Sequence, residues 1–405
     1  MNKKLMAVAV AGALAVPAVA FAQASSVQIY GRANLGIDSY SATGATNGSS
    51  ADLKSRTRVF DSSSRLGFRG EEALGNGLKA VFLMESGVNI DNGGTTGQSG
   101  AANTSTGTLS SRVGHVGLAG NWGQLTVGRS NVWWVNGNLE QTGANHINTG
   151  VNWFSGGFGR NMGVGIARLS NTVQYTSPVF SGMQAYGSYT ANSEAAQAGR
   201  KTDAQVWSIS GQGTWGAFRA RYDWVQSDAA SDANTTGNRG KGVGQKLWGG
   251  FAYQPGALIS IGWVQTELWN GFVGGGAYGG YVDPVAAAGG SIKLKQYGWG
   301  LNWEHTMGNW LFLAQYGEAK GIQGCATANA CNSTGAKSYT VAARYNLSKR
   351  TAAYVSYVET RNDSNYNLDY TNGSITSAAS PGAGLGSASV GADPKIFAIG
   401  MQHNF

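Results

Sequence analysis

The stretch Lys395-Ile-Phe-Ala-Ile-Gly-Met-Gln-His-Asn-Phe405 brings the chain to an aromatic residue. Phe397, Ile399, Met401, His403 and Phe405 share one parity, and the residues between them are small or polar. This period of two predicts a β-strand with one mostly apolar face. A strand that stops on an aromatic residue, in a chain with an export signal, predicts the closing strand of an outer-membrane β-barrel. We therefore expect Phe405 to act as an assembly signal.

The first 22 residues have the features of a secretory signal peptide. A basic pair, Lys3-Lys4, precedes an apolar segment at 5–15, and Ala20-Phe21-Ala22 fits a small-x-small cleavage site. Pro17 interrupts the apolar run, which argues against a transmembrane helix. We expect a signal peptide at 1–22 and a single barrel domain at 23–405.

The composition also favours a barrel. The chain has 63 glycines among 405 residues, and only 12% of its residues are charged, whereas about 25% is typical of a soluble protein. An uncharged outer face and glycine-rich turns would explain both values. Without Lys3 and Lys4, 27 basic residues stand against 21 acidic ones, a charge of about +6. Since no Lys/Arg cluster is longer than a pair, nucleic acid is not an expected partner.

Short and long connections alternate along the chain, as an up-and-down barrel with short periplasmic turns and long outer loops requires. Seven tight turns are expected at 75–77, 120–123, 180–182, 214–216, 254–256, 307–309 and 347–349. Eight long, polar connections are expected near 39–62, 89–110, 131–167, 192–203, 228–244, 270–291, 320–337 and 361–393. Fifteen connections join sixteen strands, so the predicted fold is an all-β, sixteen-stranded antiparallel transmembrane barrel.

The predicted strands show the period of two, with exceptions. Tyr339 and Val341 oppose Thr340, while Val81 shares its parity with Glu85. Many tryptophans lie within a few residues of a connection, which is typical of aromatic girdles at membrane interfaces.

Catalytic motifs are not apparent. The sequence has no Gly-x-Ser-x-Gly elbow, no phosphate-binding loop and no His-Glu-x-x-His, and its four histidines are isolated. We therefore expect no enzyme activity, no cofactor and no metal. The two cysteines, Cys325 and Cys331, lie in one polar connection. In an exported chain a disulfide between them is favoured over two free thiols, and the sequence leaves both alternatives open.

Several arginines have the parity of the barrel interior. They are Arg32, Arg65, Arg168, Arg219, Arg221 and Arg344. A water-filled lumen must be polar in any case, but rings of arginine also favour anions. Together with the net positive charge, this predicts an anion-preferring pore.

The third long connection, 130–167, carries Trp133, Trp134, Trp153, Phe154 and Phe158. An exposed loop this apolar would favour aggregation, so we expect it to fold into the barrel and pack on the wall, with Glu140 facing the remaining opening. An aromatic sugar track in a substrate-specific saccharide or organic-acid channel is the alternative. A structural or adhesive barrel with a plugged lumen is a more distant one.

The chain resembles the general porins of Gram-negative bacteria, in particular the β-proteobacterial trimeric porins, over essentially all of 23–405. The segments that carry the resemblance are 26–31 (SVQIYG), 64–80 (SRLGFRGEEALGNGLKA), 117–129 (GLAGNWGQLTVGR), 171–178 (NTVQYTSP) and 400–405 (GMQHNF).

The resemblance implies a homotrimer with a third loop folded inward and a channel for small hydrophilic solutes and inorganic ions. It implies an outer-membrane location, contact with lipid and lipopolysaccharide, and insertion by the barrel-assembly machinery. By motif, the constriction would contain Arg65, Arg112 and Arg168, with Glu85 on the neighbouring strand. Parity agrees for Arg65 and Arg168, but Arg112 shares the parity of the apolar Val116.

Overall fold

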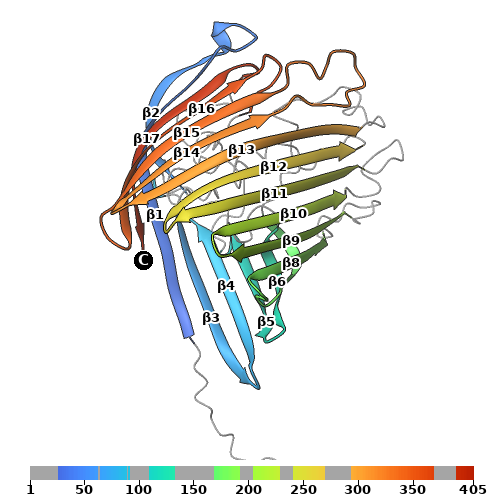
Figure 1. Cartoon of the computed structure of the whole chain (residues 1–405), viewed down its shortest axis with the longest axis vertical. Coiled ribbons are helices and arrows are strands. Elements are labelled where there is room, and N and C mark those ends of the chain that lie inside the picture. Colours follow the sequence, from blue (N-terminus) through green and yellow to red (C-terminus); the bar gives the residue numbers. More distant parts are fainter. Residues whose placement is uncertain are drawn as a thin grey trace, which may run out of the picture.

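The computed structural model describes residues 26–62, 64–88, 90–91, 109–132, 168–191, 204–228, 240–269, 293–368 and 389–405. Apart from one short 3-10 helix, η1 (Ser49–Ala51), the regular elements of these residues are β-strands (Figure 1). In chain order they are β1 (Ser26–Thr43), β2 (Leu53–Asp61), β3 (Arg65–Gly75), β4 (Leu78–Gly87), β5 (Val113–Gly120), β6 (Gly123–Asn131), β7 (Arg168–Thr176), β8 (Met183–Ala191) and β9 (Gln205–Trp215). They continue with β10 (Phe218–Asp228), β11 (Lys241–Gln254), β12 (Ala257–Trp269), β13 (Lys293–Met307), β14 (Trp310–Ala319), β15 (Ala336–Asn346), β16 (Thr351–Asn362) and β17 (Asp393–Asn404).

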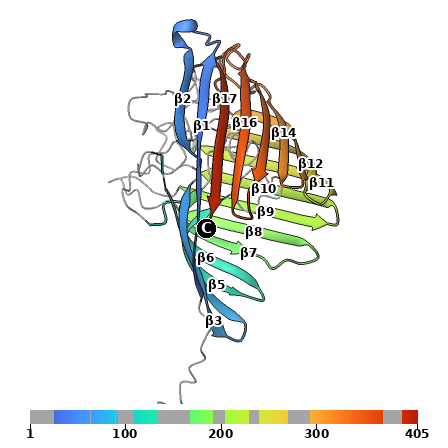
Figure 2. The same ribbon diagram turned by 90° about the vertical axis from the view of Figure 1, so that its left-hand side faces the viewer.

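The strands form one closed antiparallel sheet. β1 pairs with both β2 and β3, each strand from β3 to β16 pairs with the next one along the chain, and β17 returns to pair with β1 (Figure 2). β2 and β3 both lie along the same edge of β1, β2 opposite Leu35–Ala42 and β3 opposite Ser26–Arg32. They are two parts of one barrel strand that is interrupted at 62–64. The barrel therefore has sixteen transmembrane strands, as predicted, and the pairing of β17 with β1 closes it.

The predicted alternation of connections agrees with the strand bounds. Tight turns join β3 to β4, β5 to β6 and each later pair in the same phase, whereas the other ends of the strands are separated by longer segments. We call these two ends of the barrel the turn end and the long-connection end. The prediction of a long connection at 39–62 is wrong over most of its length, because β1 continues to Thr43 and β2 begins at Leu53.

The two faces of the sheet differ as the barrel prediction requires. Large apolar side chains such as Val27, Ile37, Ile261 and Met401 are exposed on the outward face, at 69%, 58%, 55% and 55%. Side chains of the opposite parity, which point inward, are polar or small in most positions. This arrangement places an apolar surface toward lipid and polar groups toward the interior.

Glycines allow aromatic rings to lie across neighbouring strands. A Cβ at Gly67 would collide with the ring of Tyr30, and one at Gly400 would collide with the ring of Tyr354. Each ring crosses a glycine that is its direct register partner. The abundance of glycine within strands thus has a packing reason here, although glycine weakens a strand by itself.

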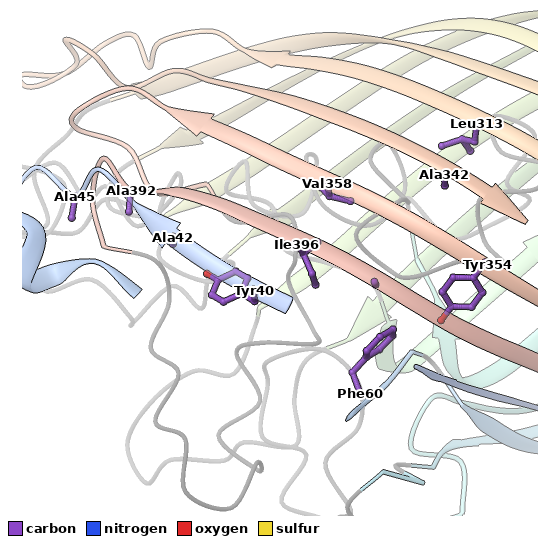
Figure 3. Close-up of a cluster of buried hydrophobic side chains, with 11 residues drawn as sticks. Tyr40, Ala42, Ala45, Phe60, Leu313, Ala342, Tyr354, Val358, Ala392 and Ile396 are labelled. Atoms are coloured by element: carbon purple, nitrogen blue, oxygen red, sulfur yellow. The ribbon is translucent and has the colours of Figure 1, made fainter. Parts of the chain in front are cut away.

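Part of the inward face is apolar. Tyr40, Phe60, Tyr354, Val358 and Ile396 are almost completely buried in one cluster over β1, β2, β16 and β17 (Figure 3). Near the long-connection end, Tyr366 is buried outside the strands and its hydroxyl donates to Gln296 Oε1 at 2.8 Å. Burial raises the pKa of Tyr366 above its ordinary value.

Three predictions concern residues outside the described part of the chain: the signal peptide at 1–22, the aromatic residues 133–158 and Glu140. Within the described part, no helix is long and apolar enough to cross a bilayer.

Candidate pore-lining site

Glu85 is the centre of a charged cluster on the inward face of β1 and β3–β5. Its Oε1 accepts from Arg112 Nε at 2.7 Å, and its Oε2 lies 3.8 Å from Arg65 Nε. Tyr30 donates its hydroxyl to Oε2 at 3.0 Å. Glu85 and Arg112 are both buried, at 9% and 8% exposure, whereas Arg65 is half-buried. Since a buried carboxylate needs partners, the two donors Arg112 and Tyr30 and the positive charge of Arg65 explain how Glu85 is held on the wall.

Local register brings the members of this cluster together. Tyr30, Gly67, Glu85 and Val113 lie side by side on β1, β3, β4 and β5. Because Gly67 has no side chain, the ring of Tyr30 passes over it and reaches Glu85. Tyr30 belongs to the site, although it was not predicted from the sequence. The feature that could have indicated it is its inward parity on β1.

Arg32 extends the cluster on β1. It is buried, donates to the carbonyl of Ser62 at 3.4 Å, and has Arg65, Arg112, Glu85 and Asp61 as charged neighbours. The interruption between β2 and β3 shapes this region. Ser64 N–H donates to Asp61 Oδ1, and Asn34 N–H donates to Ser64 Oγ, both at 2.9 Å. Side chains thus satisfy backbone groups that a continuous ladder would have used.

A second tier lies on β1 and β2, nearer the long-connection end. Arg58 donates to both carboxylate oxygens of the buried Asp38, with distances of 3.0–3.2 Å. Arg56 precedes it by two residues and is exposed. Arg56 and Arg58 were not predicted as inward residues, because 39–62 was predicted to be a loop. The alternation Arg56-Thr57-Arg58 could have indicated a strand there.

The charge of this wall is positive. In the two tiers just described, Arg32, Arg56, Arg58, Arg65 and Arg112 give +5, and Asp38, Asp61 and Glu85 give −3, so these eight groups carry a net charge of +2.

Parity groups Arg112 with the apolar Val116, but the Arg112 side chain is directed inward to Glu85. β5 begins only at Val113, and the preceding Ser110 has a φ of 79°, so the period of the strand does not extend back to Arg112. Its backbone N–H instead donates to the Glu85 carbonyl at 2.9 Å, which directs the side chain toward the Glu85 carboxylate. Arg112 and Arg65 therefore lie on either side of the Glu85 carboxylate.

Arg168 lies two strands further on, at the start of β7, and is half-buried. The parity argument for its inward orientation fails because a bulge interrupts β7. Asn171 has a φ of 55°, and the register shifts so that Leu169 pairs with the buried Ser130 and Arg168 pairs with Asn131. The alternation counted from Val173 therefore does not reach Arg168.

Arg221 points inward as predicted but forms a separate, buried network on β10 and β11. Arg221 Nη2 lies 2.6 Å from Asp223 Oδ1, and Lys246 Nζ lies 3.3 Å from Asp223 Oδ2. Arg221 also donates to Gln212 Oε1 at 2.9 Å. All three charged groups are at most 1% exposed. Lys246 was missed from sequence, since its partner is distant along the chain.

The remaining predicted residues lie near the turn end. Arg219 lines a cavity of about 280 Å³ with Gln254 and Leu258. Arg344 lines one of about 250 Å³ with Lys349, Arg350 and Asn404, and Glu304 is its acidic neighbour. These arginines do not join the Glu85 cluster.

Cys325 and Cys331 form a disulfide in the connection between β14 and β15. Phe405 extends β17: its N–H donates to the Gly31 carbonyl at 3.2 Å, and Gly31 N–H donates to its carbonyl at 3.1 Å. The ring covers Gly31, where a Cβ would collide with it. Among the residues with described positions, no group of His, Cys, Asp or Glu is suited to hold a metal.

A closed sixteen-stranded barrel with an apolar outward face and a charged inward wall defines a transmembrane pore-forming protein. Residues 7–365 match the sequence model of the Gram-negative porins. The chain belongs to this family, and it is a protein of the outer membrane.

Individual relatives agree with this family. The chain is 33% identical over 187 residues to the major outer membrane protein P.IB of Neisseria gonorrhoeae, covering 45% of this chain and 46% of that protein. It is 31% identical over 201 residues to the P.IB protein of Neisseria meningitidis, covering 48% and 51%. It thus spans about half the length of the curated relatives it matches.

Solved structures share the fold over nearly the whole chain. The anion-selective porin of Comamonas acidovorans superposes with a TM-score of 0.67 at 22% identity, covering 94% of this chain and all of that one. The trimer form of OmpT from Vibrio cholerae superposes with a TM-score of 0.60 at 12% identity, with the same coverage.

Proposed function

We propose that this protein is a channel for passive diffusion of small hydrophilic solutes and inorganic ions, with a preference for anions. The observation that carries the proposal is the cluster of Arg32, Arg65 and Arg112 on the inward wall, where three arginines have only Glu85 and Asp61 as described acidic neighbours. Inward arginines lower the barrier for anions and raise it for cations. The Comamonas relative of this fold is an anion-selective porin, which supports the same preference.

The cluster is preorganised for this task. Glu85 holds Arg112 by a short hydrogen bond and leaves the more exposed Arg65 at 3.8 Å, so at least one guanidinium keeps access to solvent. A passing anion would meet fixed positive charge without having to order a flexible side chain. The chemistry required is transient electrostatic attraction, since a site that bound tightly would slow conduction.

We also propose a homotrimer that is exported by the signal peptide at 1–22 and inserted by the barrel-assembly machinery. The trimer form of OmpT supports the assembly. The outward face of β1 and β3–β5 offers a largely apolar surface for subunit contact, with Val27, Ile29, Met84 and Val116 exposed. Glu140 and the inward third loop complete the proposed constriction.

Single-channel recording tests the function. Purified protein in a planar bilayer should give large, ohmic steps, and a KCl gradient should give a reversal potential on the anion side. Block by a saccharide or an organic acid would instead identify the alternative, a substrate-specific channel. Absence of conductance from correctly folded protein would overturn the proposal.

A further inference from the structure

A cavity of about 250 Å³ lies at the turn end of the barrel, between β15, β16 and β17. We call it the turn-end cavity. Three cations line it together with amide and hydroxyl side chains, among them Arg344, Lys349, Arg350, Ser348, Gln402 and Asn404. No Asp or Glu is among the described residues of this lining. Several cations in one small cavity are suited to bind an anion.

Strand parity places the turn-end cavity inside the barrel. Arg344 follows the buried, inward Ala342 by two residues, and Gln402 is itself buried. Met401, which precedes Gln402, is exposed on the outward face. The cavity therefore faces the interior and not the lipid, so a solute that passes through the barrel can reach it.

The turn between β15 and β16 holds two of the cations on an ordered backbone. Ser348 N–H donates to the Thr351 carbonyl, and the Ser348 hydroxyl accepts from the N–H groups of Arg350 and Thr351, with distances of 3.0–3.1 Å. The Arg350 carbonyl accepts from Asn404 N–H at 2.8 Å, which connects the turn to the end of β17. Because the backbone under Lys349 and Arg350 is already fixed, less entropy is lost when a ligand binds.

Neutral donors in the lining suit an oxyanion. Gln402 Nε2 donates to Asn404 Oδ1 at 3.1 Å, so the carbonyl end of the Asn404 amide is turned toward Gln402. The amide nitrogen of Asn404 is then the end that can donate to a ligand. The guanidinium groups of Arg344 and Arg350 add planar pairs of N–H donors, which match the oxygen atoms of a phosphate or a carboxylate. Chloride, a single atom, engages fewer of these donors at once.

The charge of the turn-end cavity fits a ligand with two negative charges. Arg344, Lys349 and Arg350 give +3, and Glu304, the acidic neighbour of Arg344, gives −1, so the net charge is +2. Glu304 is completely buried and is not part of the lining, which leaves the three cations to face a ligand. A dianion neutralises this charge, whereas a monovalent anion neutralises only half of it.

The turn-end cavity is separate from the Glu85 cluster but close to it. Asn404 of the cavity is the register partner of Arg32 on β1, and Arg32 is the register partner of Arg65 on β3. Two strand spacings, about 10 Å, thus separate the backbone of Arg65 from the lining of the cavity. An anion that passes the Glu85 cluster therefore has a second group of cations nearby.

We propose that the turn-end cavity binds small oxyanions with two negative charges, such as inorganic phosphate or a dicarboxylate. The inference rests on the proposed anion channel and deepens it by naming a class of permeating anion and a second binding site for it. Binding is weak and reversible, because Lys349 and Arg350 are exposed to solvent. Such binding is compatible with conduction, which a tight site would slow.

Phosphorus NMR of inorganic phosphate tests the site in folded, detergent-solubilised protein, in a buffer alkaline enough to keep phosphate a dianion. The phosphate signal should broaden when protein is added. Chloride should reverse the broadening only at concentrations at least tenfold higher than those at which succinate, a dicarboxylate, does so. Displacement by succinate supports one site for both dianions, and the two affinities identify the better ligand.

Variants locate the binding. Lys349→Gln/Arg350→Gln should bind phosphate roughly tenfold more weakly, since each exposed ion pair contributes about threefold. The control Lys337→Gln/Lys395→Gln removes the same charge from the outward face at the other end of the barrel and should change the affinity less than about twofold. Heat-dependent gel mobility establishes that each variant is folded before binding is measured.

The proposal would be overturned if chloride displaced phosphate as effectively as succinate does, or if both double variants weakened binding equally. Weaker binding in Arg65→Gln, with normal binding in Lys349→Gln/Arg350→Gln, would place the site at the Glu85 cluster and would also overturn it. Absence of phosphate binding from a protein that conducts with an anion preference would overturn this inference and leave the proposed function intact. Phosphate binding in the cavity of a barrel that does not conduct would support the site and overturn the proposed function.

Discussion

The Glu85 cluster makes a quantitative prediction about ion selectivity. In Glu85→Gln the amide oxygen can still accept from Arg112, so the wall keeps its shape while it loses one negative charge. A monovalent anion passing at about 6 Å from that charge meets a repulsion of about 0.7 kcal/mol at the dielectric constant of water. With a Debye length of about 10 Å at 0.1 M salt, screening reduces this energy to about 0.4 kcal/mol.

The substitution favours the anion and disfavours the cation by similar energies. The anion-to-cation permeability ratio should therefore rise about fourfold at 0.1 M salt. At 1 M the Debye length is about 3 Å, and the rise should be smaller than about 1.5-fold. Arg112→Gln should shift the ratio in the opposite direction by a similar factor.

Reversal potentials in a KCl gradient measure this ratio. Glu318→Gln is the matched control, since it removes the same charge from the outward face. An unchanged ratio at 0.1 M in Glu85→Gln, with normal single-channel conductance, would refute the placement of Glu85 on the conducting path. Equal shifts in Glu85→Gln and Glu318→Gln would show that only net charge matters.

Four further predictions follow from particular contacts. Gly67→Ala should displace the Tyr30 ring and lower barrel stability by about 1–3 kcal/mol, measured as heat-dependent gel mobility, while Gly211→Ala, with open space around its Cβ, should change it little. Deleting Phe405 should reduce the yield of folded barrel by removing the pairing with Gly31; a normal yield would contradict an assembly role. Reducing the Cys325–Cys331 disulfide should leave barrel melting unchanged and make its connection easier to cleave with protease, because the bond closes only a short loop; titration of two free thiols in untreated protein would contradict the pairing. In Glu140→Cys, with the native cysteines changed to Ser, a charged thiol reagent should lower conductance stepwise, and full modification without a change would place this residue outside the pore.

Strand parity predicted much of the wall. Arg32, Arg65 and Arg221 all point inward, because two-residue alternation holds wherever a strand is regular. It failed for Arg112, which lies before the first residue of β5, and for Arg168, where a positive φ at Asn171 interrupts the period. Neither feature has a reliable signal in a single sequence, since strand ends are hard to place and asparagine occurs in many regular strands too.

The strand at Leu53–Asp61 was missed for a different reason. Its inward residues Arg56 and Arg58 are charged and its outward residues include Ser55 and Thr57, so hydrophobicity does not alternate there. Asp38 opposite Arg58 supplies the partner that makes an inward arginine stable, but that pairing becomes visible only once the register is known. Lys246 was missed as the partner of Asp223 for the same reason, because their pairing is visible only from the register of β10 and β11.

The interruption at 62–64 has a consequence for how this wall can change. Phe60 is inward, so uninterrupted counting would put residues 62, 64 and 66 inward and 65 toward lipid. The break shifts the phase of the strand: Arg58 and Arg65 face the same side although seven positions, an odd number, separate them. A one-residue insertion or deletion here could be absorbed between β2 and β3, whereas one within β3 would move every strand residue on one side of the change to the opposite face of the sheet. The inward–outward alternation of β2 is therefore independent of that of β3. A change of length between them leaves both alternations intact, whereas a change within a regular strand does not.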